Sequence, residues 1–383
     1  MSAAKWRRSM NAGSRTAVRA APALASTKAT GYGSTTSLPA AGVEPDSSAP
    51  RWLQYLWRRL APRHVFIMAF VLIFPFVASP FFTFQVATQS LILGSIALSL
   101  SFLAGFGGMV SLAQMTVAGI AGYGVAVLGT SSSAEISLGW PWWVSIPVAV
   151  LFAVLCATAI GWLSVRTEGI YTIMITLAIG VAFYYLVLQN YSVFNGFQGL
   201  RELKPPTVLG IGWREPVPFY FLSLVCALAG YFLISYIVRA PFGIALQGIR
   251  DNPRRMAALG YDVVAHRVAA YALAGLIAAV GGVLLAWYNA LMTPGSVGTS
   301  WLINLLVIAV LGGMKHPIGA FLGAIIFVLL QTFAVDFFDR ERFNLVIGGI
   351  FLAIVLFSPD GLLGLWAKLR SRFGPNQALT STL

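Results

Sequence analysis

Ten apolar blocks, separated by short polar stretches, are the feature that most constrains what this chain of 383 residues can fold into. A helix needs about 20 predominantly apolar residues to cross the hydrocarbon core of a membrane. The blocks cover residues 65–83, 85–105, 109–129, 141–165, 170–189, 217–238, 267–288, 301–313, 318–335 and 343–357. Only 10% of the residues are charged, against about 25% in soluble domains. The pattern predicts an all-α polytopic membrane protein with about ten transmembrane helices.

The positions of the basic residues predict which side of the membrane is cytoplasmic, because Lys and Arg resist translocation. If all ten blocks cross and the N-terminus is cytoplasmic, most of the 25 basic residues are cytoplasmic too. Those left on the outer side are Arg201, Lys204, Arg214, Arg340 and Arg342. We therefore expect both termini in the cytoplasm and a multi-pass protein of the cell (inner) membrane.

Residues 1–63 differ in composition from the rest of the chain, being rich in small and basic residues and poor in large apolar ones. Such a segment cannot bury enough apolar surface to fold, so we expect a disordered basic cytoplasmic tail. An organellar transit peptide and an over-extended start site are further interpretations. We expect a transmembrane domain at 64–366, with a cytoplasmic loop at 239–266, and a cytoplasmic C-terminal tail at 367–383.

The blocks lack ionisable residues in their interiors. Carriers driven by ions or protons usually keep one at membrane depth, so the chain is predicted to be a passive channel or a machine powered from elsewhere. The sequence has no G-x-x-x-x-G-K-[ST] phosphate loop, no nucleophile–base arrangement and no Cys/His metal spacing. We expect no catalysis, no metal and no bound cofactor in this chain, and no nucleic-acid partner.

The segment GIALQGIRDNPRRMAALGYD, residues 243–262, is a charged interruption between two apolar blocks. Asn252 suits an N-cap, Pro253 the first helical position and Gly260 the residue just past a helix end. The pattern predicts a two-turn helix, capped at both ends. Arg250 and Arg254, four residues apart, are expected to share a helical face.

Two interpretations of this segment remain open on physical grounds. A short amphipathic helix at the cytoplasmic rim can dock into a groove of another protein. Alternatively, its arginines meet anionic lipid, as in an ordinary positive-inside loop.

Five stretches, in order, resemble motifs of permease subunits from branched-chain amino acid ATP-binding cassette (ABC) importers. They are LAGFGGMVSLAQMTVAGIAGYG, VRTEGIYTIMITLAIG, PFGIALQGIRDNPRRMAALGYD, LINLLVIAVLGGMKHPIGAFLGAII and FSPDGLLG. The resemblance covers residues 85 to 365 and suits the second, M-type permease of the pair. The sequence departs from the family at Gln114, where a histidine is usual, at FNGFQGL (194–200) in place of T-G-G-x-x-G-L, and at Lys315 and His316.

The resemblance implies a permease fold of the branched-chain amino acid/ribose type and a set of partners. These are a second homologous permease, two cytoplasmic ABC ATPase subunits that bind ATP and Mg, an extracytoplasmic solute-binding protein and the lipid bilayer. The chain would move branched-chain amino acids or related small polar solutes into the cytoplasm, with urea, short amides and aromatic acids as further candidates.

The resemblance also implies roles for particular residues. Coupling to the ATPases falls to Arg250, Asp251, Pro253, Arg254, Arg255, Met256, Leu259 and Gly260, with charge-assisted contacts from the arginines and an apolar anchor from Met256 and Leu259. The substrate pathway falls to Ser111, Gln114, Thr116, Thr172 and Thr176, although Ser and Thr hydroxyls often bond helix backbones instead. The solute-binding protein would dock on Asn195, Gln198, Arg201, Glu202 and Lys204 in the outer loop.

One alternative belongs to a different class of protein. A stand-alone channel or facilitator for a small polar solute such as urea would also need no charges within the membrane. It would form a homo-oligomer and would not depend on nucleotide.

Overall fold

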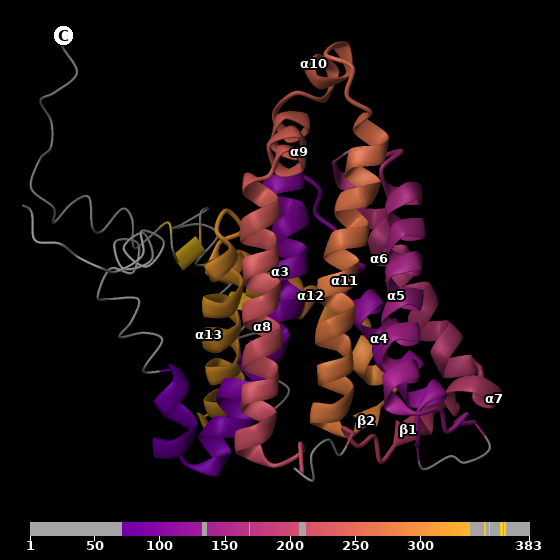
Figure 1. Cartoon of the computed structure of the whole chain (residues 1–383), viewed down its shortest axis with the longest axis vertical. Coiled ribbons are helices and arrows are strands. Elements are labelled where there is room, and N and C mark those ends of the chain that lie inside the picture. The colour runs from indigo at the N-terminus through magenta and orange to yellow at the C-terminus, as the bar shows by residue number, and fades with distance from the viewer. Residues whose placement is uncertain are drawn as a thin grey trace, which may run out of the picture. The chain divides into compact units, whose positions relative to one another are not determined.

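The described part of the chain folds almost entirely into helices (Figure 1), as the apolar blocks predict. The computed structural model describes residues 71–131, 136–167, 169–206 and 212–337, together with 348–349, 352, 361–362 and 364. These residues all belong to one compact unit, 62–383. The predicted tails at 1–63 and 367–383, nearly all of block 343–357 and the start of block 65–83 lie outside the described residues.

The elements follow one another as helices with two very short strands. In chain order they are η1 (Phe82–Thr88), α3 (Gln89–Gly107), α4 (Gln114–Leu128), α5 (Trp142–Ser164), α6 (Ile170–Gln189), α7 (Tyr191–Phe194), η2 (Gly196–Gln198), β1 (Leu200–Arg201), α8 (Pro216–Arg239), α9 (Pro241–Asp251), α10 (Pro253–Ala258), α11 (Val263–Asn289), β2 (Leu291–Met292), η3 (Pro294–Val297), α12 (Thr299–Gly312) and α13 (Pro317–Phe337).

Helices α3 and α11 form the centre of the unit and run in opposite directions. Gly281 of α11 faces Ile96 of α3, and further along α11 the Tyr288 hydroxyl donates to Gln85 Oε1 over 3.1 Å. The most apolar windows of these two helices are 78% and 67% buried, against 22–33% for α5, α6 and α8. The exposed side chains of α5, α6 and α8 are largely apolar, as expected of helices that face lipid.

The first and second halves of the described unit repeat one arrangement with opposite direction. In the first half, α3 is followed by a non-helical segment, the short helix α4 and the long helix α5. In the second half, α11 is followed by a connection that contains β2 and η3, then by the short helix α12 and the long helix α13. Each leading helix packs antiparallel on the long helix of the other half, since Gly161 of α5 faces Tyr271 of α11 and Gly94 of α3 faces Phe321 of α13. Inverted repeats of this kind are common in transporters.

Small residues allow the close helix approaches that this arrangement needs. A Cβ at Gly282 of α11 would collide with the Ala118 carbonyl of α4. Likewise, Gly312 of α12 meets Gly319 and Gly323 of α13. Small residues are how membrane helices bring their backbones together.

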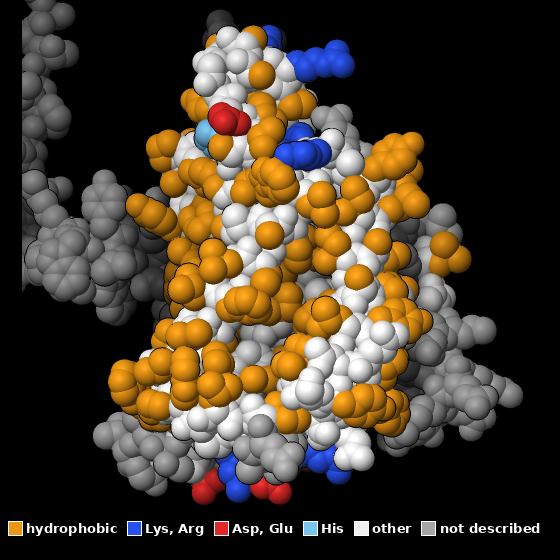
Figure 2. Space-filling view, turned by 90° about the vertical axis from the view of Figure 1, so that its right-hand side faces the viewer, with side chains coloured by type: hydrophobic (Ala, Val, Ile, Leu, Met, Phe, Trp, Pro, Cys, Tyr) orange, Lys and Arg blue, Asp and Glu red, His pale blue; other side chains and the backbone are white. Residues whose placement is uncertain are grey.

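The described residues contain five helices long and apolar enough to cross a membrane. Three predicted crossings take other forms. Block 109–129 is a non-helical stretch followed by the 15-residue α4, while blocks 301–313 and 318–335 are α12 and α13, bent by 117° and countable as one sixth span. The polytopic all-α class is therefore confirmed, whereas ten regular spans are not what the described residues form. On the face in Figure 2, charged side chains gather at the two ends and apolar ones cover the middle.

Candidate functional site

The segment between α8 and α11 folds into two short helices at one end of the unit (Figure 1). Helix α9 lies against α3 and buries Leu246 and Ile249 completely. Helix α10 lies beyond it and contains no buried residue. This end is the tip of the described helices, so α10 is available to another protein.

The predicted caps of this segment are confirmed. Asn252 Oδ1 accepts from the Arg255 backbone N–H over 3.0 Å, and Pro253 occupies the first helical position. Gly260 has φ +91, which suits a residue just past a helix end. Asn252 is also extended, with φ −155, and separates α9 from α10. The expectation that Arg250 and Arg254 share one helical face is therefore wrong, because the helix is interrupted between them.

The predicted coupling residues point in two directions. Arg254, Arg255 and Leu259 are exposed, and Leu259 keeps 68% of its surface accessible. Met256 instead turns back toward α9, where a Cβ at Gly248 would lie 2.9 Å from its Sδ. Met256 therefore holds α10 on α9, and Leu259 is the apolar side chain free for a partner.

Arg250 is the other residue of the segment that contacts the rest of the unit. Its Nη1 donates to the Gly105 carbonyl in the last turn of α3, and its Nε donates to Asp251 Oδ1 over 2.9 Å. Asp251 also pairs with Nη2 at 2.9 Å. The ion pair is partly exposed, with 37% of the Arg250 side chain accessible, so it adds little to stability. Its main effect is to orient the guanidinium group.

The five predicted pathway residues cluster around the non-helical stretch between α3 and α4. All are buried: Ser111, Gln114, Thr116, Thr172 and Thr176. The Leu112 backbone N–H in this stretch donates to Thr176 Oγ1 of α6 over 3.1 Å. A backbone donor that lacks a helical partner at membrane depth must find one elsewhere, and Thr176 supplies it.

The hydrogen bonds divide four of these five residues into two kinds. Thr172 and Thr176 donate to the carbonyls of Thr167 and Thr172, over 2.9 and 3.0 Å. Gln114 Nε2 and Thr116 Oγ1, by contrast, have no hydrogen-bond partner among the described residues. Because an unsatisfied buried polar group is costly, these two are the members of the set best suited to meet a passing solute or water.

Two further hydroxyl groups escaped the sequence analysis. The hydroxyl of Tyr271, from α11, lies close to Ser111 and also to Ser164, at the end of α5. Neither hydroxyl satisfies hydrogen-bond geometry within the described part of the chain. Only the antiparallel packing of α5 on α11 brings them to this stretch, and nothing in their local sequence marks them.

The outer loop folds around the FNGFQGL stretch. Asn195, with φ +57, donates through Nδ2 to the Gly199 carbonyl over 2.9 Å. The loop then pairs β1 antiparallel to β2, with Leu200 opposite Met292. Of the predicted docking residues, Gln198, Arg201, Glu202 and Lys204 are exposed, whereas Asn195 is half-buried and shapes the turn.

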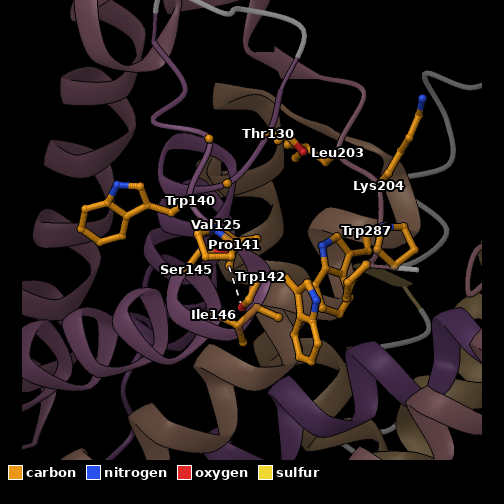
Figure 3. A pocket seen from close by; sticks show the side chains of 14 residues that line it. Val125, Thr130, Trp140, Pro141, Trp142, Ser145, Ile146, Leu203, Lys204 and Trp287 are labelled. Carbon is orange, nitrogen blue, oxygen red and sulfur yellow. Dashed lines mark hydrogen bonds between the residues drawn. The ribbon is translucent and has the colours of Figure 1, made fainter. Parts of the chain in front are cut away.

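A pocket of about 440 Å³ lies beside this loop (Figure 3), at the end of the helices opposite α10 (Figure 1). Its lining includes tryptophan rings from two elements, Trp142 of α5 and Trp287 of α11. Thr130 and Lys204 also line it. Tryptophan at the ends of membrane helices is typical of the membrane–water boundary, which places this end of the unit at the second surface of the membrane.

These features define a class: a multi-pass membrane permease with an inverted repeat, unwound segments in its interior and an exposed helical segment at one surface. The sequence matches, over residues 82–355, the family described as branched-chain amino acid transport system, permease component. The chain belongs to this family. No solved structure shows a significant match.

Several characterised permeases are similar over most of their length. The high-affinity branched-chain amino acid permease LivM of Escherichia coli is 25% identical over 78% of this chain and 74% of its own length. BraD of Pseudomonas aeruginosa, described in the same terms, is 25% identical over 70% and 90%. The nucleoside ABC transporter permease NupC of Lactococcus lactis is 25% identical over 66% and 83%. The family, rather than a stand-alone urea channel, accounts for the chain.

Proposed function

We propose that this chain is the permease subunit of an ABC importer for branched-chain amino acids. The observation that carries the proposal is α10, a capped helix with no buried residue at one surface of a family permease. Three relatives that match over most of their length are named as branched-chain amino acid permeases, which favours this solute class over nucleosides.

In this proposal, two separate ATPase subunits bind ATP and Mg and act on α10. Arg254 and Arg255 make charge-assisted contacts with them, and Leu259 fills an apolar pocket. All three side chains are exposed. Energy then enters from the cytoplasm, which agrees with helices that carry no ionisable residue well inside their apolar blocks.

The remaining partners are assigned to other surfaces. A second homologous permease pairs with this chain in the cell (inner) membrane, and Gln114 and Thr116 offer their unpaired polar atoms to the solute. A solute-binding protein docks at the opposite end, on the exposed Gln198, Arg201, Glu202 and Lys204. Contacts there orient the binding protein over the permeases.

The first experiment is recovery of partners from mild detergent with this chain as bait, identified by mass spectrometry. We expect a second permease and an ATPase. The double variant R254E/R255E should recover the second permease but lose at least about tenfold of the ATPase, since one well-placed charge-assisted contact is worth that much.

The matched control is R166E, a charge reversal at an exposed arginine that stacks on Trp162, 4.0 Å from the ring centroid, at the end of α5. It should leave ATPase recovery unchanged. Recovery of the chain only with copies of itself, indifferent to either reversal, would contradict the proposal.

The solute is tested in proteoliposomes that hold the recovered assembly. We expect ATP-dependent uptake of leucine, isoleucine and valine in the presence of the binding protein. Uptake of urea that ignores ATP would instead identify a channel.

A further inference from the structure

Arg250 lies at a junction of three parts of the described unit. Its guanidinium donates to the Gly105 carbonyl near the C-terminal end of α3. Its side-chain stem lies on Gly108, where a Cβ would come within 2.5 Å of Arg250 Cγ. The Gly105 backbone in turn lies against the Met314 carbonyl, in the bend between α12 and α13.

The contact at Gly105 has a clear electrostatic basis. The last carbonyls of a helix have no intrahelical donor, and a cation is favoured there by the helix dipole. Asp251 pairs with two nitrogens of the same guanidinium, so the partly exposed planar group is held between this carboxylate and the end of α3.

The stretch that follows Gly108 carries the buried polar residues of the candidate pathway. Gly108 has φ +68 and ends α3, and the Met109 N–H returns to the Leu103 carbonyl over 3.0 Å. Ser111 and the Leu112 N–H, which bonds Thr176, come directly afterwards. A displacement of Gly108 therefore moves the backbone that positions these groups.

The other side of the junction leads to α10. Arg250 is in the last turn of α9, and α10 is fastened to α9 by Met256 against Gly248. An uninterrupted series of packed contacts thus runs from the exposed helix α10, through α9 and Arg250, to Gly108 and Ser111.

We propose that Arg250 is a positioning residue that transmits displacement of α10 to the stretch 108–113, and that it does not contact the ATPase. This inference rests on the proposed function, because it takes the ATPase to be what displaces α10. It separates two roles within one segment. Arg254 and Arg255 bind the partner, and Arg250 passes the movement inward.

The test measures movement of the stretch 108–113 and does not require the solute. V110C introduces a thiol in the half-buried stretch, in a chain whose free Cys156 and Cys226 are replaced by Ala. The rate of alkylation by a maleimide is measured in the full assembly, with and without ATP and Mg. We expect ATP to change this rate in the V110C chain and R250A to abolish the change.

Recovery of the ATPase separates transmission from docking. R250A should keep the ATPase, whereas R254A should lose it together with the alkylation response. R250K, which keeps a cation at the end of α3 but lacks the planar fork, should restore part of the response. If R250A acted only by unfolding the chain, the assembly would lose the ATPase. Partial recovery of the response in R250K would instead show that the cation itself is needed.

Leucine uptake by R250A should fall at least about tenfold, the effect of one lost charge-assisted contact. Loss of the ATPase by R250A, to the same extent as by R254A, would make Arg250 a docking residue and overturn the inference. If the alkylation rate of the V110C chain does not change with ATP while the ATPase is bound, the inference is also overturned. Absence of any ATPase in the assembly would refute the proposed function itself.

Discussion

Gly199 shapes the outer loop through its backbone alone. It has φ +66, and a Cβ there would collide with the Met292 carbonyl of β2. G199A is expected to lower the free energy of unfolding by about 3 kcal/mol, because the left-handed backbone and the collision both add cost. The shift in melting temperature of the purified chain in detergent measures it.

Gly139 offers the matched control, since it has φ +64 with nothing within 4 Å of a Cβ. G139A should cost only the backbone term, about 1 kcal/mol. Equal shifts for the two variants would show that the approach of the loop to β2 contributes nothing.

Thr176 supports the unwound stretch before α4 with a single oxygen. T176V removes the acceptor of the buried Leu112 N–H, and an unsatisfied buried donor costs about 1–3 kcal/mol. T176S keeps the oxygen and should restore most of the lost melting temperature. The comparison is T158V, because Thr158 bonds only the Val154 carbonyl of its own helix; it should be nearly neutral. A loss of uptake without a loss of stability in T176V would assign Thr176 to the pathway instead.

The contact of Arg250 with α3 could not be predicted from the sequence. The arginines of residues 243–262 form one cluster in the sequence, and a uniform role was the natural expectation. Arg250 turns inward because the end of α3 presents an unpaired carbonyl beside it. Such a partner, distant in the chain, has no local signature.

At the scale of elements, α10 depends on its cap. A helix of six residues has few internal hydrogen bonds, so the bond from the Arg255 N–H to the Asn252 side chain matters for its stability. N252A should destabilise α10 by about 1 kcal/mol and reduce ATPase recovery while leaving every arginine in place. N252D retains the cap and serves as its control. Recovery unchanged by N252A would mean that the ATPase binds the segment without needing the helix.

Long apolar helices and capped turns were predictable, whereas breaks inside apolar blocks were not. The stretch MVSLA, residues 109–113, is as apolar as the helices beside it, so its composition does not reveal that it is unwound. The break after α11, by contrast, falls between the predicted blocks 267–288 and 301–313; it begins at Ala290, with φ +52, and contains Pro294, Gly295 and Gly298. Apolar composition predicts that a segment lies in the membrane, but it does not show where a helix ends within that segment.

At the scale of the molecule, the cytoplasmic side remains a prediction from the basic residues. F197C and L259C place thiols at two exposed positions at opposite ends, 75% and 68% accessible, in the chain without its own cysteines. An impermeant maleimide added outside intact cells should label F197C, and L259C only after lysis. The reverse pattern would invert the assigned orientation and remove α10 from the reach of cytoplasmic ATPases.

Helix α11 gives the molecule one unbroken rod between its two ends. Its 27 residues extend about 40 Å, starting at the Asp262 cap beside α10 and ending directly before β2, which is strapped to the outer loop by β1. A load applied to that loop from outside and a load applied to α10 from inside therefore arrive on the same beam. Because the helix is continuous between these two ends, a force applied at either end would be carried along its axis to the other.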